Sequence, residues 1–496
     1  MDEAISSIAA VALMQNGLPV LPSGIVYSRA ILNTFLIAAS FNLFGINEFA
    51  ARLPSVLFGT LTIFLVYIMG LKWGNRRIAI IATVLVTFSV WEIAWSRQAR
   101  MYQQLQFFYL LSLFTFYEFT YNKSIKWLTL LAFSVIGAVL SHVFGYILLI
   151  VFLVYLVTLT LKEHKRMNID KIGINHIALA LVFMALLVLS FYRGVIQSVL
   201  ETDIDYYDTY IYLLKKDLGI FLFLAVPGGT VLVNKDWKKG LILIAALVLP
   251  LYFIFFHVLL IGTRYLYFVI PILFILIGYF LDFVIEYLGI TFARTGNSVH
   301  KKRYPVHNNL ETLRSSIPLL NTIQSIPEKT VFNIIVAFLL ILAMYFSPAF
   351  TFTPKEYYGL GVNAPQSDFK NAYMYVKDNM KPEDVIVSAW TPPAQFYLGK
   401  NDYWLAFNVV GTGSKPFLME NSTRDIYTNA TAIFDVATLE EVVEQNERGW
   451  LVVDRVGWYK LGPSMREFIG NNLTTYMNSG EINTVNVYGW KNENTN

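Results

Sequence analysis

The sequence contains no cysteine and little charge: none of its 496 residues is Cys, and only 15% are Asp, Glu, Lys or Arg. The lack of cysteine excludes disulfide bonds, thiolate metal sites and cysteine nucleophiles. Because 38 basic and 34 acidic residues leave a net charge of only +4, nucleic acid is not expected as a partner. The P-loop, GxGxxG, HExxH and GxSxG motifs are also missing, which speaks against an ATP-driven pump with its own nucleotide domain and against an HExxH metalloprotease.

Apolar residues are abundant instead. They make up 56% of the chain, and the mean hydropathy is +0.51. They lie in runs of about 20 residues, the length that crosses a hydrocarbon layer of about 30 Å as a helix. This pattern excludes a soluble cytoplasmic enzyme and a disordered or fibrous chain, and it predicts a polytopic membrane protein.

The long apolar runs predict about ten transmembrane helices. Their approximate ranges are 49–71, 76–95, 103–121, 125–140, 143–161, 176–193, 217–233, 241–261, 265–288 and 330–350.

Basic residues follow every second predicted span, as the positive-inside rule requires of cytoplasmic loops. These residues are Lys72, Arg76, Arg77, Lys123, Lys126, Lys162, Lys165, Arg166, Lys171, Lys235, Lys238, Lys239, Arg294, Lys301, Lys302 and Arg303. We therefore expect residues 1–48 and everything after about 351 to lie outside. If residues 28–45 crossed the membrane instead, with 1–27 in the cytoplasm, the orientation would be reversed.

The start of the chain is unusual for an outer segment, because no hydrophobic stretch precedes it. We expect that Met1 is not the natural start and that a first transmembrane helix is missing. Residues 30–43 are apolar but short, and we interpret them as a juxtamembrane helix that lies along or dips into the membrane.

Three regions follow: an outer first loop over 1–48, an all-α transmembrane domain over 49–350 with a cytoplasmic loop at 291–329, and an extracytoplasmic α/β domain over 351–496. In the last region, helices are predicted at 368–380, 438–448 and 464–472, and strands at 384–389, 450–454 and 484–490. Thr438 and Glu441 have the spacing of a capping box. The sequons at Asn421, Asn429 and Asn472 predict glycosylation, whereas the sequon at Asn122 is expected to be cytoplasmic and unmodified.

Polar residues near the predicted outer helix ends are the candidates for chemistry. Asp2 and Glu3 open the first loop and are either catalytic or simply solvated. Glu48 and Arg52 are spaced i, i+4, a spacing that favours a local ion pair at the membrane surface over direct site support. His142 is expected to be a hydrogen-bonded turn residue rather than a ligand.

Arginines on the outer side run against the charge trend. Arg97 and Arg100 precede Tyr102, and Arg264 precedes Tyr265. Arg97 and Arg100 either reach the lipid headgroups or bind a phosphate, whose oxygens guanidinium can hold in a bidentate fashion. The acidic, tyrosine-rich stretch 203–212 could stack on a sugar ring or cover the site. No cluster of metal ligands is evident, and no cofactor is expected.

The order and spacing of several short motifs resemble GT-C glycosyltransferases, in the branch that contains protein O-mannosyltransferases and the lipid-A aminoarabinose transferase (glycosyltransferase family 39-like). The motifs are Asp2-Glu3-Ala4, Asn16-Gly17-Leu18-Pro19, the segment from Leu43 to Glu48, Ala51-Arg52-Leu53-Pro54, the segment from Ser96 to Tyr102, Gly262-Thr263-Arg264-Tyr265, the segment from Ala372 to Asp384, and the segment from Ala394 to Gly399.

This resemblance implies an inverting transfer of a sugar from a polyprenyl (dolichyl) phosphate donor to an acceptor hydroxyl on the outer face. The acid of the family's first outer loop corresponds to Asp2, with Glu3 beside it. Arg97, Arg100, Tyr102, Arg264 and Tyr265 are then expected to bind the donor phosphate. The acceptor could be a protein, a lipid or another glycan, and the donor sugar is not legible.

Two other function classes stay open at this point. A transporter or flippase of lipid-linked sugars would show internal repeats and broken helices near the midplane, and no repeat is visible. A membrane-anchored binding module would not need ten spans. The sequons and the cysteine-free outer domain suit a cell-surface membrane protein, and an archaeal source fits them.

Overall fold

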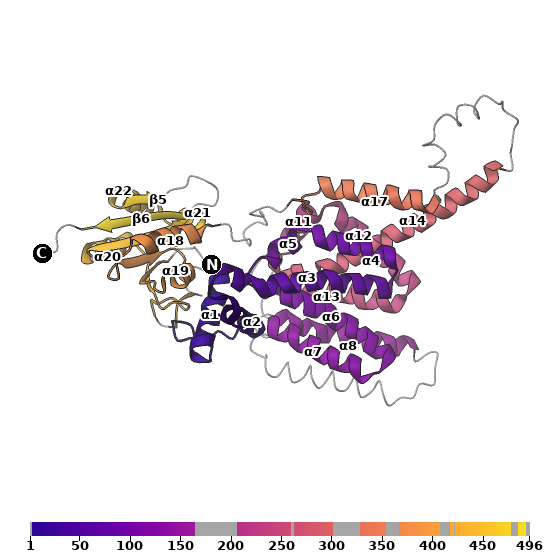
Figure 1. Ribbon diagram of the computed structural model, residues 1–496, viewed down its shortest axis with the longest axis horizontal. Helices are drawn as coiled ribbons and strands as arrows, with labels where there is room; N and C mark the ends of the chain where they lie inside the picture. Colours follow the sequence, from indigo (N-terminus) through magenta and orange to yellow (C-terminus); the bar gives the residue numbers. More distant parts are fainter. Residues whose placement is uncertain are drawn as a thin grey trace, which may run out of the picture. The chain divides into compact units, whose positions relative to one another are not determined.

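The computed structural model describes residues 2–163, 206–258, 262–300, 328–353, 367–406, 417–420, 422–477 and 485–492. Figure 1 shows a largely helical chain with one small sheet near its C-terminal end. The chain divides into two compact units. One comprises residues 1–57, 96–101 and 357–496, and the other comprises 58–95 and 102–356. The predicted span 176–193 and most of the loop 291–329 lie outside the described residues.

In the described residues of the second unit, all the regular elements are helices. Its regular elements are α3 (Glu48–Trp73, which begins in the first unit), α4 (Arg76–Phe88), α5 (Val90–Ser96), α6 (Tyr102–Asn122), α7 (Ile125–Ser141), η1 (Val143–Tyr146), α8 (Ile147–Glu163), α11 (Tyr207–Leu218), α12 (Ile220–Lys235), α13 (Trp237–His257), η2 (Thr263–Tyr265), η3 (Tyr267–Val269), α14 (Ile270–His300) and α17 (Glu328–Phe346).

Several of these helices fit a membrane by length and composition. Among the described residues, four segments qualify: Glu48–Trp73, Val143–Lys162, Trp237–His257 and Tyr267–Leu288. The bent pair α11–α12 would add a fifth. A largely helical chain with several apolar helices is thus confirmed, whereas the predicted number of about ten spans is not.

Two predicted spans are interrupted. The span 76–95 breaks at Ser89, where the chain pairs with the segment after α17: Val90 N–H donates to the carbonyl of Ala349 at 2.8 Å, and Thr351 N–H to that of Phe88 at 2.9 Å. The span 217–233 bends by 98° at Gly219, whose φ of +52° is a conformation that glycine adopts without a steric penalty. Apolar composition alone shows neither break.

Close helix packing holds this unit together. A Cβ at Gly228 on α12 would lie 1.9 Å from the carbonyl oxygen of Leu276 on α14, so only glycine fits at this crossing. At one end of the unit, Asp282 is buried and accepts from Arg77 Nε at 2.6 Å and from Asn75 Nδ2 at 2.7 Å. Lys235 Nζ lies 4.0 Å from the same carboxylate. The basic residues of two predicted cytoplasmic loops therefore gather around one acid.

The first unit begins with two helices, α1 (Asp2–Asn16) and α2 (Ile31–Phe44), and α2 coincides with the short helix predicted at 30–43. Ala10 on α1 packs with Ile37 and Phe41 on α2. Leu43 and Phe44, at the end of α2, are largely exposed. Exposed apolar side chains at this helix end suit contact with lipid.

The C-terminal part of this unit is an α/β domain with a six-stranded sheet in the order β3-β2-β1-β4-β6-β5. Strands β1 to β4 are parallel, and β6 and β5 complete the sheet with antiparallel pairs. The elements are α18 (Phe369–Asn379), β1 (Val385–Ser388), α19 (Thr391–Leu398), β2 (Tyr403–Leu405), β3 (Thr431–Ile433), α20 (Val436–Gln445), β4 (Arg448–Asp454), α21 (Arg455–Lys460), α22 (Pro463–Asn472), β5 (Thr474–Met477) and β6 (Val485–Lys491).

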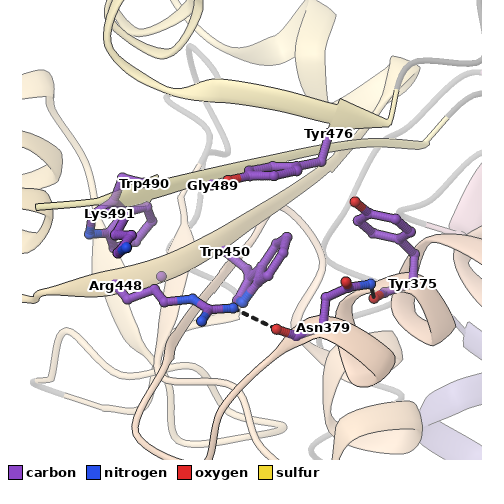
Figure 2. Close-up of a pocket in the computed structure, with 9 residues that line it drawn as sticks. Tyr375, Asn379, Arg448, Trp450, Tyr476, Gly489, Trp490 and Lys491 are labelled. Atoms are coloured by element: carbon purple, nitrogen blue, oxygen red, sulfur yellow. Dashed lines mark hydrogen bonds between the residues drawn. The ribbon is translucent and has the colours of Figure 1, made fainter.

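Each face of the sheet has its own apolar core. Helices α20 and α22 cover one face, and α18 and α19 cover the other. A pocket opens beside Trp450 of β4, where α18 borders the sheet (Figure 2). The predicted α/β class is confirmed, together with the three predicted helices and the three predicted strands.

One detail of the sequence prediction is wrong. Helix α20 begins at Val436, so Thr438 is not its N-cap. Asp435 caps the helix instead, accepting from the backbone N–H of Thr438 at 2.8 Å. Asp is a preferred N-cap residue, and its position three residues earlier lengthens the helix at this end.

Candidate functional site

The predicted catalytic acid pair lies in the first turn of α1. Helix α1 begins at Asp2, whose side chain is outside the description. Glu3 is 18% exposed and forms a bidentate pair with Arg52 of α3, at 2.8 Å from Nε and 2.9 Å from a terminal guanidinium nitrogen. A third donor, the backbone N–H of Ala99, reaches Glu3 at 2.8 Å.

These contacts determine the charge of Glu3. Burial raises the pKa of its carboxyl group, but the hydrogen bonds and positive charge of Arg52, with the N–H of Ala99, outweigh burial and lower the pKa below its ordinary value. A carboxylate with a lowered pKa is a weak base. Glu3 is therefore better suited to hold Arg52 and the 96–101 segment in place than to accept a proton.

The 96–101 segment is fixed from a second side. Ser55 of α3 donates through its hydroxyl to the carbonyl of Arg100 at 3.0 Å. Ala99 is 1% exposed and packs in the cluster that joins α1, α2 and the start of α3. Of the two predicted phosphate-binding arginines here, Arg97 is exposed and Arg100 is buried. Arg97 is thus the more solvent-accessible of the two.

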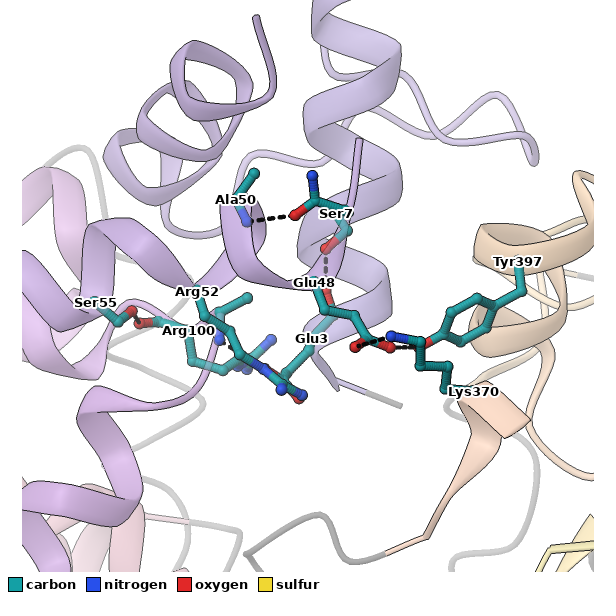
Figure 3. A network of polar contacts seen from close by, with 11 residues as sticks. Glu3, Ser7, Glu48, Ala50, Arg52, Ser55, Arg100, Lys370 and Tyr397 are labelled. Carbon is teal, nitrogen blue, oxygen red and sulfur yellow. Dashed lines mark hydrogen bonds and ion pairs between the residues drawn. The ribbon is translucent and has the colours of Figure 1, made fainter. Parts of the chain in front are cut away.

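The local ion pair predicted between Glu48 and Arg52 is wrong. Arg52 hydrogen-bonds to Glu3, whose two oxygens match the guanidinium fork. Glu48 turns instead to the C-terminal domain: it accepts from the hydroxyl of Tyr397 on α19 and from Lys370 Nζ on α18 at 3.2 Å (Figure 3). Burial, followed by the contact with Glu48, raises the pKa of the Tyr397 hydroxyl, so this hydroxyl stays a donor.

An aromatic cluster in the second unit brings together other predicted site residues. The ring centre of Tyr102, at the start of α6, lies 5.7 Å from that of His142, and the ring centre of His142 lies 6.4 Å from that of Tyr265. The guanidinium of Arg264 lies 5.2 Å from the Tyr265 ring centre, within cation–π range. His142 Nδ1 accepts from the N–H of Phe144 at 3.2 Å, as expected of a turn residue.

Sequence reasoning missed a buried polar network in this unit. Tyr267 contacts Glu92 at 2.6 Å and also donates to the side-chain oxygen of Gln103. Gln106 Nε2 donates to Glu92 at 2.9 Å and to the backbone carbonyl of Tyr267 at 3.0 Å. Glu92 is an acid inside a predicted apolar span, and such residues mark functional or structural centres. That signal was available in the sequence.

The remaining predicted residues fall in the C-terminal domain or outside the description. Asn429 and Asn472 are exposed, as glycosylation requires, and Asn421 lies outside the described residues, as does part of the stretch 203–212. Within the described part of the chain, no group of three His, Asp or Glu side chains could hold a metal ion.

Comparisons with known proteins give one family and several structures. The family model of dolichyl-phosphate-mannose-protein mannosyltransferase matches residues 28–192. No curated protein sequence matches the chain.

Three solved structures share its architecture. ArnT from Cupriavidus metallidurans in the apo state has a TM-score of 0.59 at 14% identity, covering 98% of this chain and 93% of that one. The same protein bound to undecaprenyl phosphate also gives 0.59 at 14%, over 99% and 93%. The archaeal oligosaccharyltransferase AglB from Archaeoglobus fulgidus, in complex with an inhibitory peptide and a dolichol-phosphate, gives 0.50 at 11%, over 97% and 69%.

At these identities the structural likeness establishes the fold. Together with the family match it confirms the resemblance to GT-C proteins of the mannosyltransferase and aminoarabinose transferase branch, and it indicates a glycosyltransferase.

Proposed function

We propose that the protein is an integral-membrane, inverting glycosyltransferase that moves a sugar from a polyprenyl phosphate to an acceptor hydroxyl on the outer face of the membrane. The observation that carries the proposal is the start of α1, where two acids open the helix and Glu3 is held by Arg52 and the N–H of Ala99. A helix start that is held in this way can position a catalytic side chain rigidly. The structures with bound undecaprenyl phosphate or dolichol-phosphate support the class of donor.

Asp2 is the proposed general base. It removes the proton of the acceptor hydroxyl, and the hydroxyl oxygen attacks the anomeric carbon of the sugar. The bond between that carbon and the phosphate oxygen breaks, and the polyprenyl phosphate leaves with the electron pair. Attack opposite the leaving group inverts the anomeric carbon.

The leaving phosphate gains negative charge, which cationic groups stabilise. Arg97 and Arg264 are each proposed for this role. Arg264 lies against Tyr265, in the cluster with Tyr102 and His142. The buried Arg100 is proposed to act through the position of its segment rather than through direct contact.

The test is transfer of radiolabelled sugar from polyprenyl-phosphate hexoses and pentoses, in membranes that contain the wild type, Asp2→Asn or Asp378→Asn. Asp378 is an exposed acid of α18 and serves as the matched control. We expect transfer by the wild type and the control and its loss in Asp2→Asn. Transfer that persists in Asp2→Asn would contradict the proposed base. If the wild type gives no labelled product with any donor, the transferase proposal fails and the transporter alternative is favoured.

A further inference from the structure

The C-terminal domain contains a pocket of about 250 Å³ (Figure 2). Its lining residues are far along the chain from the predicted catalytic residues Asp2 and Glu3. Helix α18 contributes Tyr375 and Asn379, and three neighbouring strands contribute the rest of the lining. The other lining residues are Arg448, Gly449, Trp450, Tyr476, Gly489, Trp490 and Lys491. The volume is below the range of pockets for drug-sized ligands, which begins at about 300 Å³, so a single small ring is the appropriate size of occupant.

Three aromatic rings from three different elements form one wall of the pocket. Trp450 on β4 lies 5.1 Å from Tyr476 on β5 and 6.2 Å from Tyr375 on α18, and the two tyrosine rings are 6.5 Å apart. Figure 2 shows these three side chains turned towards the same space. The rings are in mutual contact and leave no gap for another ring between them, and their planes are inclined to one another by 81°, 39° and 51°.

Glycines in the sheet let these rings lie close to the backbone. Gly489 is paired with Trp450 across the strands, and a Cβ at Gly489 would come within 2.9 Å of the Tyr476 ring. Covering such glycines is a structural role that aromatic side chains often have. Trp490 covers Gly449 and is only 5% exposed, so covering the glycine is a sufficient explanation for this side chain. Tyr476 covers Gly489 as well, but 45% of it stays exposed, so part of its ring remains accessible to a ligand.

The polar side of the pocket is preorganised by hydrogen bonds. Arg448 Nε lies 3.3 Å from the fully buried carboxylate of Asp384, and a terminal nitrogen of Arg448 donates to the carbonyl of Asn379 at 2.5 Å. The same carboxylate accepts from the indole N–H of Trp450 at 2.7 Å. One buried acid therefore holds both the guanidinium and the ring beside it, and Lys491 adds an exposed cation at the rim.

We propose that this pocket binds one pyranose ring of a glycan. The apolar face of the sugar would lie on the exposed parts of Tyr375 and Tyr476, which the buried Trp450 supports from behind, because aromatic faces offer broad contact to C–H groups at little entropic cost. Its hydroxyl groups would meet Arg448, the amide of Asn379 and Lys491. The site is a second saccharide site, separate from the transfer chemistry, and it would hold an acceptor or product glycan. That biological role, though not the binding itself, rests on the proposed function.

The test is saturation-transfer difference NMR of the full-length protein, in a detergent without a sugar headgroup and without donor lipid. The probes are methyl glycosides of the common hexoses and hexuronic acids. We expect saturation transfer to at least one probe with the wild type. Tyr476→Ala is expected to weaken it at least about tenfold, equivalent to about 1.4 kcal/mol. Tyr459→Ala, which removes a 66% exposed tyrosine of α21 in the same domain, is expected to leave it unchanged.

Lys491→Ala is the second variant, because this exposed terminal residue of β6 can be replaced without disturbing the sheet core. It is expected to weaken binding of the same probe. Asp2→Asn is expected to bind as the wild type does. The absence of binding to every probe, or binding that survives both Tyr476→Ala and Lys491→Ala, would overturn the proposal. So would binding lost in Asp2→Asn. Binding without any transferase activity would refute the proposed function and leave this site intact.

Discussion

Replacing Glu92 by glutamine is expected to be much milder than replacing it by alanine, because the hydrogen bonds around its carboxyl group require a proton on it. The direction of each hydrogen bond follows from the backbone carbonyl of Tyr267, which can only accept. Gln106 Nε2 donates to it, so the amide oxygen of Gln106 faces Gln103 and must accept from Gln103 Nε2 at 2.9 Å. The amide oxygen of Gln103 then accepts the single hydroxyl hydrogen of Tyr267.

Because the Tyr267 hydroxyl has only one hydrogen, and Gln103 accepts it, the tyrosine cannot also donate across the 2.6 Å contact with Glu92. It is then a hydrogen bond only if the carboxyl group donates, so we expect Glu92 to be a neutral acid in this network. Glutamine reproduces both contacts: its oxygen accepts from Gln106 and its amide donates to Tyr267. We expect Glu92→Gln to cost less than about 1 kcal/mol.

Alanine removes both contacts at a site where Glu92 is only 7% exposed. It leaves one N–H of Gln106 without its acceptor, at about 1–3 kcal/mol, and adds a small cavity. We expect a total of about 2–4 kcal/mol, read as a lower thermal unfolding midpoint in detergent. Infrared difference spectra should show the carbonyl band of a protonated carboxylic acid, absent in Glu92→Gln. If glutamine is as damaging as alanine and the band is missing, the carboxyl is ionised and the proton count is wrong.

Three further outcomes are expected. Because the folded-state pKa of Glu3 is lowered, the stabilising effect of its charge is complete above the unfolded pKa of about 4.3 and is lost as pH falls through the folded pKa. The difference in unfolding midpoint between wild type and Glu3→Gln should therefore be constant above about pH 5 and shrink in acid. A difference that does not depend on pH would contradict the charged state of Glu3. Asp282→Ala should lower stability by about 1–3 kcal/mol, since it removes a buried partner of Arg77, and thermal unfolding measures the loss. Asn429→Gln should remove one glycan from the mass of protein made in a glycosylating host, whereas Asn122→Gln should not; the reverse result would contradict the predicted orientation.

The sequence predicted long helices well where the apolar run is uninterrupted. Helix α3 at Glu48–Trp73 matches the predicted 49–71 because nothing inside it competes with helix formation except Pro54, which the helix accommodates. The breaks at Ser89 and Gly219 were not predicted, since each depends on tertiary structure: Ser89 on strand-like pairing with the segment around Phe350, and Gly219 on a bend that composition does not require.

The contacts of the candidate site were predictable only in part. The motif around Asp2 and Glu3 and the arginine-containing segments are local features of the sequence, and the site predicted from them stays a prediction. The partners of those residues are not local: Tyr397 lies 349 positions from Glu48, and Arg52 lies 49 positions from Glu3. Spacing rules reach three or four residues along a helix, so they favoured a Glu48–Arg52 pair that the fold replaces with two distant ones.

The two acids at the start of α1 are therefore expected to have different tasks. Both oxygens of Glu3 are occupied by three N–H donors, from Arg52 and Ala99, and its pKa is lowered. A group in that state holds the 96–101 segment against α1 and α3 but has little tendency to take a proton from an alcohol. Loss of the charge at Glu3 should consequently appear first in stability, and loss of the charge at Asp2 first in turnover. Opposite behaviour of the two variants would mean that the ion pair opens during the reaction and that Glu3 is the base.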